Sequence, residues 1–156
     1  TLTAMAKGGI FDQIGGGFSR YSTDEKWLVP HFEKMLYDNA LLINSYSAAF
    51  ERTGKEVYHQ IAQRTSEYIL RELRSPQGGF FCGQDADSGG VEGGYYLFTA
   101  EEICSVLGNT QGKAFSRLYG IGSGAAVPNL IGKVYSEEDF IKKRMSFLQK
   151  FIELSA

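Results

Sequence analysis

Cysteine is scarce in this sequence, apolar runs are short and basic residues are not in excess, and each of these scarcities excludes a class of protein. The two cysteines, Cys82 and Cys104, form neither a CxxC pair nor a disulfide framework, which favours small buried side chains in a reduced, cytoplasmic setting. No apolar stretch reaches the roughly 18 residues that a membrane span needs. A net charge of -2 with dispersed Lys and Arg argues against nucleic acid as a partner.

What is present is an ordinary globular composition. Hydrophobic residues make up 43% and charged residues 22% of the 156 positions, which suits one core and a single domain over residues 1–156. The chain begins at Thr1 and shows no positively charged, apolar leader. We therefore expect it to be an internal fragment of a longer protein.

Two helices are predicted from the spacing of apolar residues. The first covers 32–53, with Pro30 suited to the first helical position, and its apolar side chains on nearly every side predict a buried, inner helix. The second covers 55–74 and is amphipathic, which predicts an outer helix with one solvated face. Gly54 is the breaker between them, so the two helices are expected to form an antiparallel hairpin.

The hairpin places two glycine-rich segments at one end of the molecule. Thr53 and Glu56 match a capping box at the start of the second helix, so the turn is short and segments 8–31 and 75–99 meet. Both segments carry many aromatic residues, which favours functional loops over disorder. Within 75–99, GGFFCGQD and GGYYLFT predict the two strands of a short β-hairpin.

The rest of the chain is also predicted to be helical. Thr99 and Glu102 match a second capping box, and Gly108 ends the helix that they open. The predicted class is all-α, built from helical hairpins with a short β-hairpin in a loop at their rim. The remaining predicted elements are a weaker helical segment at 113–119, a loop at 120–135 and an amphipathic helix from Ser136 to the end.

Two stretches of the chain read GGIFDQIGGGFSRYSTDEKWLVPHFEKMLYDNALL and GGFFCGQDADSGGVEGGYYLFTAEEI. They closely resemble the YyaL-like family, the thioredoxin-domain proteins related to the spermatogenesis-associated protein. The resemblance covers roughly residues 1–108. It implies part of an (α/α)6 toroid, similar to N-acylglucosamine 2-epimerase and six-hairpin glycosidases, and a thioredoxin-like partner domain elsewhere in the full-length protein.

His31 and Glu33 are the first acid–base candidates. Both are expected in the first turn of the helix, where its dipole disfavours a positive charge and favours a negative one. A neutral imidazole at His31 suits a general base, whereas a capping or core histidine is the alternative. Glu33 is either a second acid–base group or a residue that stabilises the helix start. His59, on the polar face of the second helix, is expected to be solvated.

Five further residues near this helix are candidates for substrate binding. Arg20 and Tyr21 can clamp hydroxyl or carboxylate groups, and Tyr21 and Trp27 offer flat faces for a sugar ring. Packing of loop aromatics is the alternative for both rings. Asp38 and Asn39 lie among apolar residues, where bonds to neighbouring helices or loop backbone are the alternative to a role in binding.

The stretch QDADSGGVEGG carries more acidic residues at the same rim. Asp85 and Asp87 are predicted as acid or base residues of a sugar-processing cleft, and Glu92 and Tyr95 as substrate-binding residues. A calcium loop counted from Asp85 would need an acidic ligand at its twelfth position, where a tyrosine stands, so no metal is predicted. The triple glycine at 15–17 lacks the following Lys and Ser or Thr of a phosphate loop.

Two functions remain open at this point. One is a sugar isomerase, epimerase or glycosidase-like enzyme that uses His31, Glu33, Asp85 and Asp87 without a cofactor. The other is a non-catalytic binding or scaffolding module that accompanies a thioredoxin-like domain. For the site, His31 and Asp87 are expected within about 10 Å of each other. For the isolated fragment, exposed apolar surface predicts an oligomer whose contacts involve the inner helix and the terminal helix rather than the polar face of 55–74.

Overall fold

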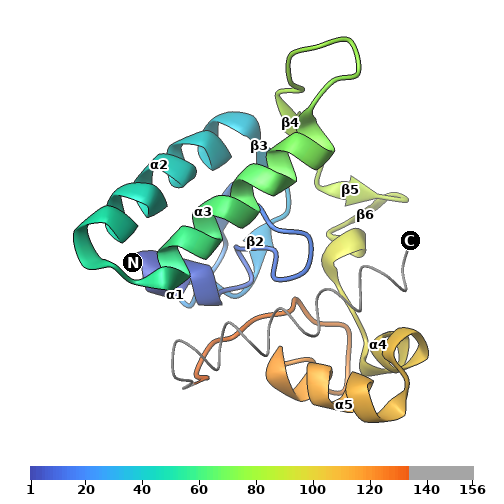
Figure 1. Ribbon diagram of the computed structural model, residues 1–156. Coiled ribbons are helices and arrows are strands. Elements are labelled where there is room, and N and C mark those ends of the chain that lie inside the picture. Colours follow the sequence, from blue (N-terminus) through green and yellow to red (C-terminus); the bar gives the residue numbers. More distant parts are fainter. Residues whose placement is uncertain (134–156) are drawn as a thin grey trace. The chain divides into compact units, whose positions relative to one another are not determined.

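The computed structural model describes residues 1–133, so the helix expected from Ser136 lies outside the described residues. The chain divides into two compact units, Thr1–Tyr95 and Tyr96–Ala156, and each unit is described by itself. Helices are the main elements of the described residues, and short antiparallel strand pairs accompany them in the first unit (Figure 1), which confirms the predicted class of helical hairpins with a short β-hairpin in a loop. The expectation of a single domain over the whole chain stays a prediction.

The first unit contains most of the elements. Its helices are α1 (Leu2–Lys7), α2 (Leu36–Thr53), α3 (Glu56–Tyr68) and the π-helical turn η1 (Ile69–Leu73), and the 3-10 turn η2 (Gly94–Tyr96) lies at its boundary. Its strands are β1 (Tyr21–Ser22), β2 (Pro30–His31), β3 (Lys34–Met35), β4 (Gly83–Gln84), β5 (Asp87–Ser88) and β6 (Val91–Glu92).

The predicted hairpin is present, with a different start. Gly54 ends α2 with φ 65° and ψ 8°, the left-handed conformation that glycine adopts at little cost, and α2 and α3 lie side by side (Figure 1). The capping box expected at Thr53 and Glu56 does not form. Lys55 precedes α3 instead, and the Thr53 hydroxyl donates to the carbonyl of Ala49 at 2.7 Å.

The start of the first helix was predicted wrongly. Residues 30–35 are extended rather than helical because they pair with other strands: β2 with β1, and β3 with β4. The first N–H of α2, on Leu36, donates to the carbonyl of Cys82 at 2.9 Å. His31 and Glu33 therefore lie before the helix rather than in its first turn.

The prediction of a buried inner helix and a solvated outer helix is reversed in this unit. Buried residues of α2 are only Asn39 and Tyr46, and Leu41 on the same helix is 64% exposed. The loop at Gly16 lies against α3, because a Cβ there would be 2.7 Å from the carbonyl oxygen of Arg64. The loop that follows α1 thus packs directly on α3. The buried residues of α3 are Tyr58, Ile61, Ala62, Thr65 and Tyr68.

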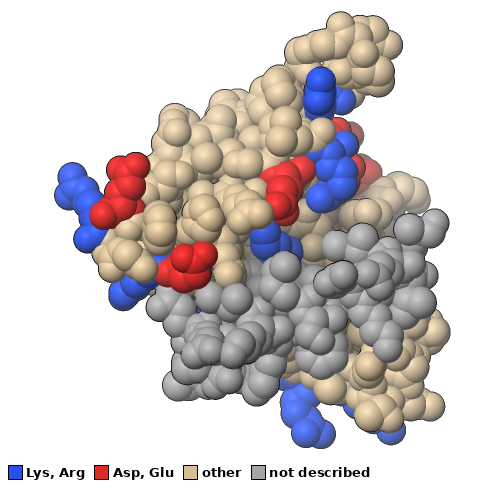
Figure 2. All heavy atoms as spheres, in the orientation of Figure 1, with Lys and Arg blue, Asp and Glu red and all other residues tan. Residues whose placement is uncertain are grey.

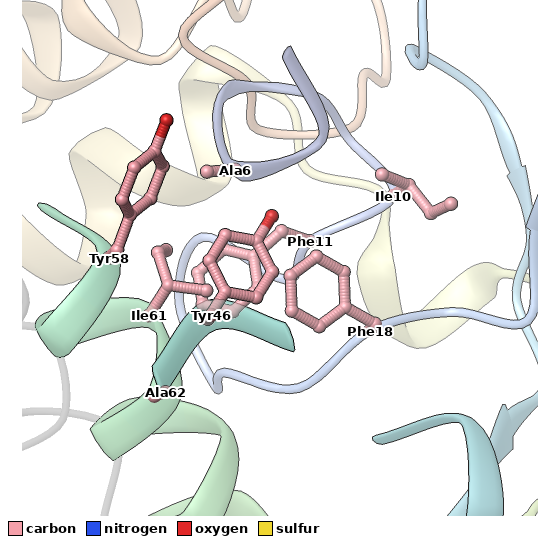
Figure 3. Close-up of a cluster of buried hydrophobic side chains, with 8 residues drawn as sticks. All are labelled: Ala6, Ile10, Phe11, Phe18, Tyr46, Tyr58, Ile61 and Ala62. Carbon is pink, nitrogen blue, oxygen red and sulfur yellow. The ribbon is translucent and has the colours of Figure 1, made fainter. Parts of the chain in front are cut away.

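The core of the first unit is a group of aromatic rings that joins this loop to both helices (Figure 3). The ring of Tyr46 from α2 lies 5.4 Å from Phe18 and 6.0 Å from Tyr58 of α3, and Phe18 lies 4.8 Å from Phe11. The Tyr46 hydroxyl donates to the carbonyl of Leu2 at 2.8 Å. Burial raises the pKa of Tyr46, so this hydroxyl stays a neutral donor.

A β-hairpin does lie in the segment after the second helix, although not between the stretches predicted for it. It joins β5 to β6 through Gly89 and Gly90, which both have positive φ. Of the predicted stretches, GGFFCGQD supplies β4, which pairs with β3, and GGYYLFT begins with the 3-10 turn η2. Pairing with a strand from before the first helix therefore replaced the expected local pairing.

The second unit begins as the sequence predicts. Thr99 and Glu102 form the expected capping box at α4 (Ala100–Leu107), and Gly108 ends that helix with φ 77°. Helix α5 (Asn109–Leu118) then starts four residues before the expected segment. The two helices pack closely, since a Cβ at Gly112 would lie 2.6 Å from the Cα of Cys104.

The two cysteines differ in exposure. Cys104 is partly buried against α5, but Cys82 is exposed, which contradicts the expectation that both side chains are buried. Cys82 contributes to the fold through its backbone, because its carbonyl accepts the first N–H of α2, and this contact does not require its side chain to be buried.

The face of the molecule in Figure 2 carries charged side chains of both signs. On the face shown in Figure 2, acidic and basic side chains lie among each other, and the area over α2 carries few charges away from the turn that follows it. Among the helices of residues 1–133, none combines the length and the apolar character needed to cross a membrane.

Candidate functional site

The site is centred on His31, which the two-stranded sheet β1–β2 holds in place. Tyr21 and His31 are direct partners in this antiparallel pair. Their rings stack with 5.1 Å between centroids and 24° between planes. Because opposite residues of such a pair project to the same face, the sheet register itself produces the stack. Tyr21 remains 52% exposed, so its ring also faces solvent.

Carboxylates flank the imidazole of His31. Its Nδ1 lies 2.8 Å from Oε1 of Glu92, and its Nε2 lies 3.8 Å from Oε2 of Glu33. An ionised carboxylate only accepts hydrogen bonds, so Nδ1 carries the proton in the neutral ring and Nε2 holds the lone pair. The side chains of His31 and Glu33 are 29% and 31% exposed, which leaves both accessible.

Arg20 extends this row beyond Glu33. Its Nη1 donates to Oε2 of Glu33 at 2.9 Å, and its backbone N–H donates to the carbonyl of Glu33 at 2.8 Å. The hydrogen bond to Glu33 is the main cause that raises the pKa of Arg20, and neighbouring Tyr37 adds to it. We call Glu92, His31, Glu33 and Arg20 the His31 row.

Asp38 lies beside the row, in the first turn of α2. Burial raises the pKa of Asp38; the charge of Glu33 adds to this rise, whereas the charge of Arg20 opposes it. Its Oδ2 atom is buried and has no hydrogen-bond partner among the described residues. The side chain thus belongs electrostatically to the row without being bonded to it.

Asn39 and Trp27, also predicted as binding residues, serve the fold. Asn39 is buried, accepts the N–H of Phe18 at 2.7 Å, and donates to the carbonyls of Phe18 at 3.0 Å and Met35 at 2.9 Å. Trp27 has a positive φ of 64°, accepts the N–H of Ile10 through its carbonyl, and packs against the core. A role of either residue in substrate binding stays a prediction.

The turn between β1 and β2 depends on Asp24. Its carboxylate accepts the N–H groups of Lys26 at 2.7 Å, Leu28 at 3.2 Å and Val29 at 2.6 Å. These backbone donors, chiefly Val29, lower the pKa of Asp24. The turn that returns the chain to His31 is therefore built around one ionised side chain.

The acidic loop reaches the row through its hairpin. Asp87 pairs with Glu92 across β5 and β6, and Glu92 contacts His31, so the two glycine-rich segments do meet at one end of the hairpin as predicted. Asp85 accepts the N–H of Asp87 at 3.2 Å and thereby shapes a turn. Tyr95 is 68% exposed. The direct approach of Asp87 to His31 stays a prediction.

The sequence did not reveal a buried ion pair behind the row. Nζ of Lys34 lies 2.8 Å from Oδ2 of Asp12, donates to the carbonyl of Gly16 at 3.0 Å and lies 4.5 Å from the ring centre of Tyr68. Burial opposes ionisation of Asp12, but Lys34 and the N–H groups of Gly15 and Ile14 outweigh it and lower the pKa of this carboxyl. If residues 30–35 had been read as a strand, its alternation would have placed Lys34 on the opposite face from Glu33. Lys34 would then have been expected to be buried and to need an acidic partner.

No family model matches the chain. Spermatogenesis-associated protein 20 from Homo sapiens is 48% identical over 113 residues, which is 69% of this chain and 14% of the human protein. The chain resembles a segment of spermatogenesis-associated protein 20. The Mus musculus protein of that name is 39% identical over 154 residues, which is 89% of this chain and 19% of the mouse protein.

This chain therefore spans less than a fifth of the length of the two spermatogenesis-associated proteins. A second kind of relative is cellobiose 2-epimerase from Bacteroides fragilis, 36% identical over 61 residues, which is 39% of this chain and 16% of that enzyme.

Proposed function

We propose that the His31 row is the acid–base part of a carbohydrate site, of the sugar isomerase, epimerase or glycosidase-like type. One observation carries the proposal: the His31 imidazole lies between the carboxylates of Glu92 and Glu33 and stacks on the exposed ring of Tyr21. A general base needs a lone pair that is held in a defined direction. An exposed aromatic face beside it suits a sugar ring.

Each contact of His31 supports a step of such chemistry. Glu92 holds the proton on Nδ1, which keeps the lone pair on Nε2. When Nε2 accepts a proton from a sugar carbon next to a carbonyl group, the ring becomes positive 3.8 Å from the carboxylate of Glu33. That carboxylate stabilises the charge while the proton is held, and the proton then returns to the sugar.

The surrounding residues supply binding. Arg20 is 45% exposed although it binds Glu33, so its remaining N–H groups are accessible to sugar hydroxyl groups. Asp87, on the hairpin that brings Glu92 to His31, is the further acid–base candidate. Asp85 supports the turn before it. The name of the relative cellobiose 2-epimerase supports a sugar as the substrate class.

The proposal also includes the architecture. The α2–α3 hairpin with its chemistry at one end is the repeat from which an (α/α)6 toroid is built, and a toroid collects such ends around one cavity. In the full-length protein a thioredoxin-like domain would accompany it. The toroid and the partner domain remain proposals of the resemblance, whereas the hairpin is observed.

The test is solvent exchange. The full-length protein is incubated in D2O with aldohexoses, N-acylglucosamine and reducing disaccharides, and the proton signal at C2 is followed by NMR. We expect its loss with at least one sugar, and a decrease of about 10²–10⁴-fold in rate for His31→Asn. The matched control is His59→Asn, which changes an exposed histidine on α3.

If the folded protein showed neither exchange at C2 nor glycoside hydrolysis with any of these sugars, the proposed enzyme function would be overturned. Equal rates for His31→Asn and His59→Asn would remove His31 from the mechanism.

The second candidate is the non-catalytic module. The observation in its favour is that several polar side chains of this region bind backbone groups: Asn39 binds Phe18 and Met35, and Asp24 binds the turn. A scaffold has its polar groups bound in this way. Binding of a separately expressed thioredoxin-like domain with no sugar turnover would support this function.

A further inference from the structure

The β5–β6 hairpin has little buried surface to hold it in place. It lies outside the helical hairpin (Figure 1), and all of residues 87–92 are exposed. Nothing lies within 4 Å of a Cβ at Gly89 or Gly90 in its turn. At its base, the N–H of Gly93 donates to the carbonyl of Ala86 at 2.9 Å. A segment with so few buried contacts opens at low cost.

The contact between Glu92 and His31 ties this hairpin to the β1–β2 sheet. Among residues 1–133, it is the one polar side-chain contact between the hairpin and another element, with 2.8 Å between Nδ1 of His31 and Oε1 of Glu92. The Nδ1–H group donates to Glu92 whether the ring is neutral or positive. A positive ring adds charge attraction to the same hydrogen bond. The contact is therefore stronger when the ring carries a second proton.

The hairpin also contains a repulsive pair. Asp87 and Glu92 are direct partners across β5 and β6, so their carboxylates project to the same face. Like charges directly opposite each other destabilise an antiparallel pair. Asp85, which accepts the N–H of Asp87 at 3.2 Å, adds a third negative charge. Positive charge beside Glu92 relieves this repulsion, and the imidazole of His31 is the group in contact with Glu92 that can supply it.

Other groups act on the His31 ring from the sheet side. The Glu33 carboxylate, 3.8 Å from Nε2, and the stacked face of Tyr21 favour a positive ring, whereas Arg20 opposes it while bound to Glu33. These three residues stay beside the ring whether the β5–β6 hairpin is open or closed. Glu92 leaves with the hairpin. The charge of the ring therefore distinguishes the closed form from the open form through Glu92.

We propose that the β5–β6 hairpin is a flap and that the His31–Glu92 contact is its latch, which tightens when the ring gains a proton. A proton that stabilises the closed form raises the population of that form as pH falls. Histidine side chains ordinarily titrate between pH 5 and 8, and carboxylic acids below this range. The flap is therefore expected to be more closed at pH 5.5 than at pH 8.

In the site, the latch couples flap closure to the proton transfer, and this part rests on the proposed function. Nε2 of His31 takes the proton from C2 of an open-chain aldose. The electron pair of that C–H bond forms a C1–C2 double bond, and the π pair of the carbonyl becomes a lone pair on its oxygen. The positive ring holds the flap closed over this period. Return of the proton to C2 restores the carbonyl, neutralises the ring and loosens the latch.

The test is amide hydrogen exchange of the full-length protein without sugar, followed by mass spectrometry. One peptide covers residues 86–93 and the reference peptide lies in 36–53, and rates are corrected for the intrinsic pH dependence of exchange. From pH 8 to pH 5.5, protection of the flap peptide should rise about two- to fivefold, the range of an exposed ion pair. The reference peptide should keep its protection. A flap peptide with equal protection at both pH values would overturn the latch.

Variants separate the latch from a general effect of pH. Glu92→Gln keeps an acceptor oxygen without the charge, and His31→Asn removes the titrating ring, so both should abolish the rise. Asp87→Asn removes the repulsive partner and should raise protection at pH 8. Glu51→Gln, which changes an exposed residue of α2, is the control and should keep the full rise. A full rise in Glu92→Gln would also overturn the latch.

Failure of the flap and failure of the proposed function are distinguishable. The exchange experiment contains no sugar, so a flap without pH response overturns the latch whether or not the protein turns over a sugar. A flap with the expected response, in a protein that acts on no sugar, overturns the proposed function and leaves the latch in place.

Discussion

Lys34 and Asp12 form an ion pair of 2.8 Å directly behind the strand segment that presents His31 and Glu33. Lys34 is 1% exposed, and Asp12 also accepts the N–H groups of Ile14 and Gly15. The pair joins the loop before β1 to β3. Stability of the fold and position of the site therefore depend on the same two side chains.

Breaking this pair from one side is expected to be severe. Lys34→Met leaves the carboxylate of Asp12 buried and unpaired, and we expect it to lower the free energy of unfolding by about 3–5 kcal/mol. The double variant Lys34→Met with Asp12→Leu removes both charges and should recover part of the loss. Urea unfolding followed by circular dichroism measures both. A single variant as stable as the unchanged chain would contradict the burial of the pair.

The turn at Asp24 should make stability depend on pH in the acid range. Its pKa is lower in the folded state than the ordinary 3.8, so its contribution is fully present above 3.8 and is lost as pH falls through the folded value. Asp24→Asn should therefore lower the thermal midpoint at pH 7, and the difference should shrink at lower pH. A difference that is constant between pH 7 and pH 2 would contradict the role of the ionised carboxylate.

The contact between the acidic hairpin and His31 depends on Gly93. It has φ 71°, and a Cβ there would overlap the ring of Phe32, so Gly93→Ala should push β6 away and separate Glu92 from His31. We expect the ¹⁵N signals of the His31 ring to shift. Gly90→Ala is the control, because its φ is 80° but nothing lies within 4 Å of its Cβ. It should cost about 1 kcal/mol locally and leave His31 unchanged.

His31 itself should contribute little to stability. The ring is 29% exposed, and its partner Glu92 is 53% exposed, so the loss of their pair is expected to cost at most about 1 kcal/mol. His31→Ala should keep the thermal midpoint within a few degrees while abolishing sugar turnover by the full-length protein. A variant that unfolds would favour a structural role for His31.

The exposed face of α2 should associate. Leu41 is 64% and Tyr37 48% exposed, so α2 presents large apolar side chains to solvent. We expect these 156 residues alone to form an oligomer through this face, and Leu41→Lys to shift it toward a monomer in light scattering. Leu70→Lys, which changes a 56% exposed residue of η1, is the control. A stable monomer at tens of micromolar would contradict the prediction.

The sequence predicted correctly the features that depend on nearby residues, such as helix ends, caps and helical periodicity. Gly54 ends α2, Thr99 begins α4, and the helical periodicity located both members of the hairpin. The segment PHFEKM was misread because its apolar residues suit a helix and a strand alike, and the choice was made by β1 and β4, which are distant in sequence. Periodicity also shows which face is apolar but not what covers it, which is why the burial of α2 and α3 was reversed.

The sequence selected the residues of the row by type but did not specify their arrangement. His31, Glu33, Arg20 and Glu92 were all selected by residue type, and the structure brings them into one row. Their order in that row follows from strand pairing, which the sequence could not specify. Lys34 was overlooked because a charged residue in a predicted helix is normally assigned to solvent, whereas the extended backbone turns it toward Asp12.

The pairing of β3 with β4 has a consequence for how this segment can vary. Lys34 and Met35 leave the pair into α2, and the chain returns from η1 to Gly83 and Gln84 beside them. The helical hairpin therefore leaves and rejoins the fold at the paired strands β3 and β4. At its far tip, a Cβ at Gly54 would have nothing within 4 Å. Turns of helix can be added at that tip in matched pairs while β3 and β4, and the side chains attached to them, stay where they are.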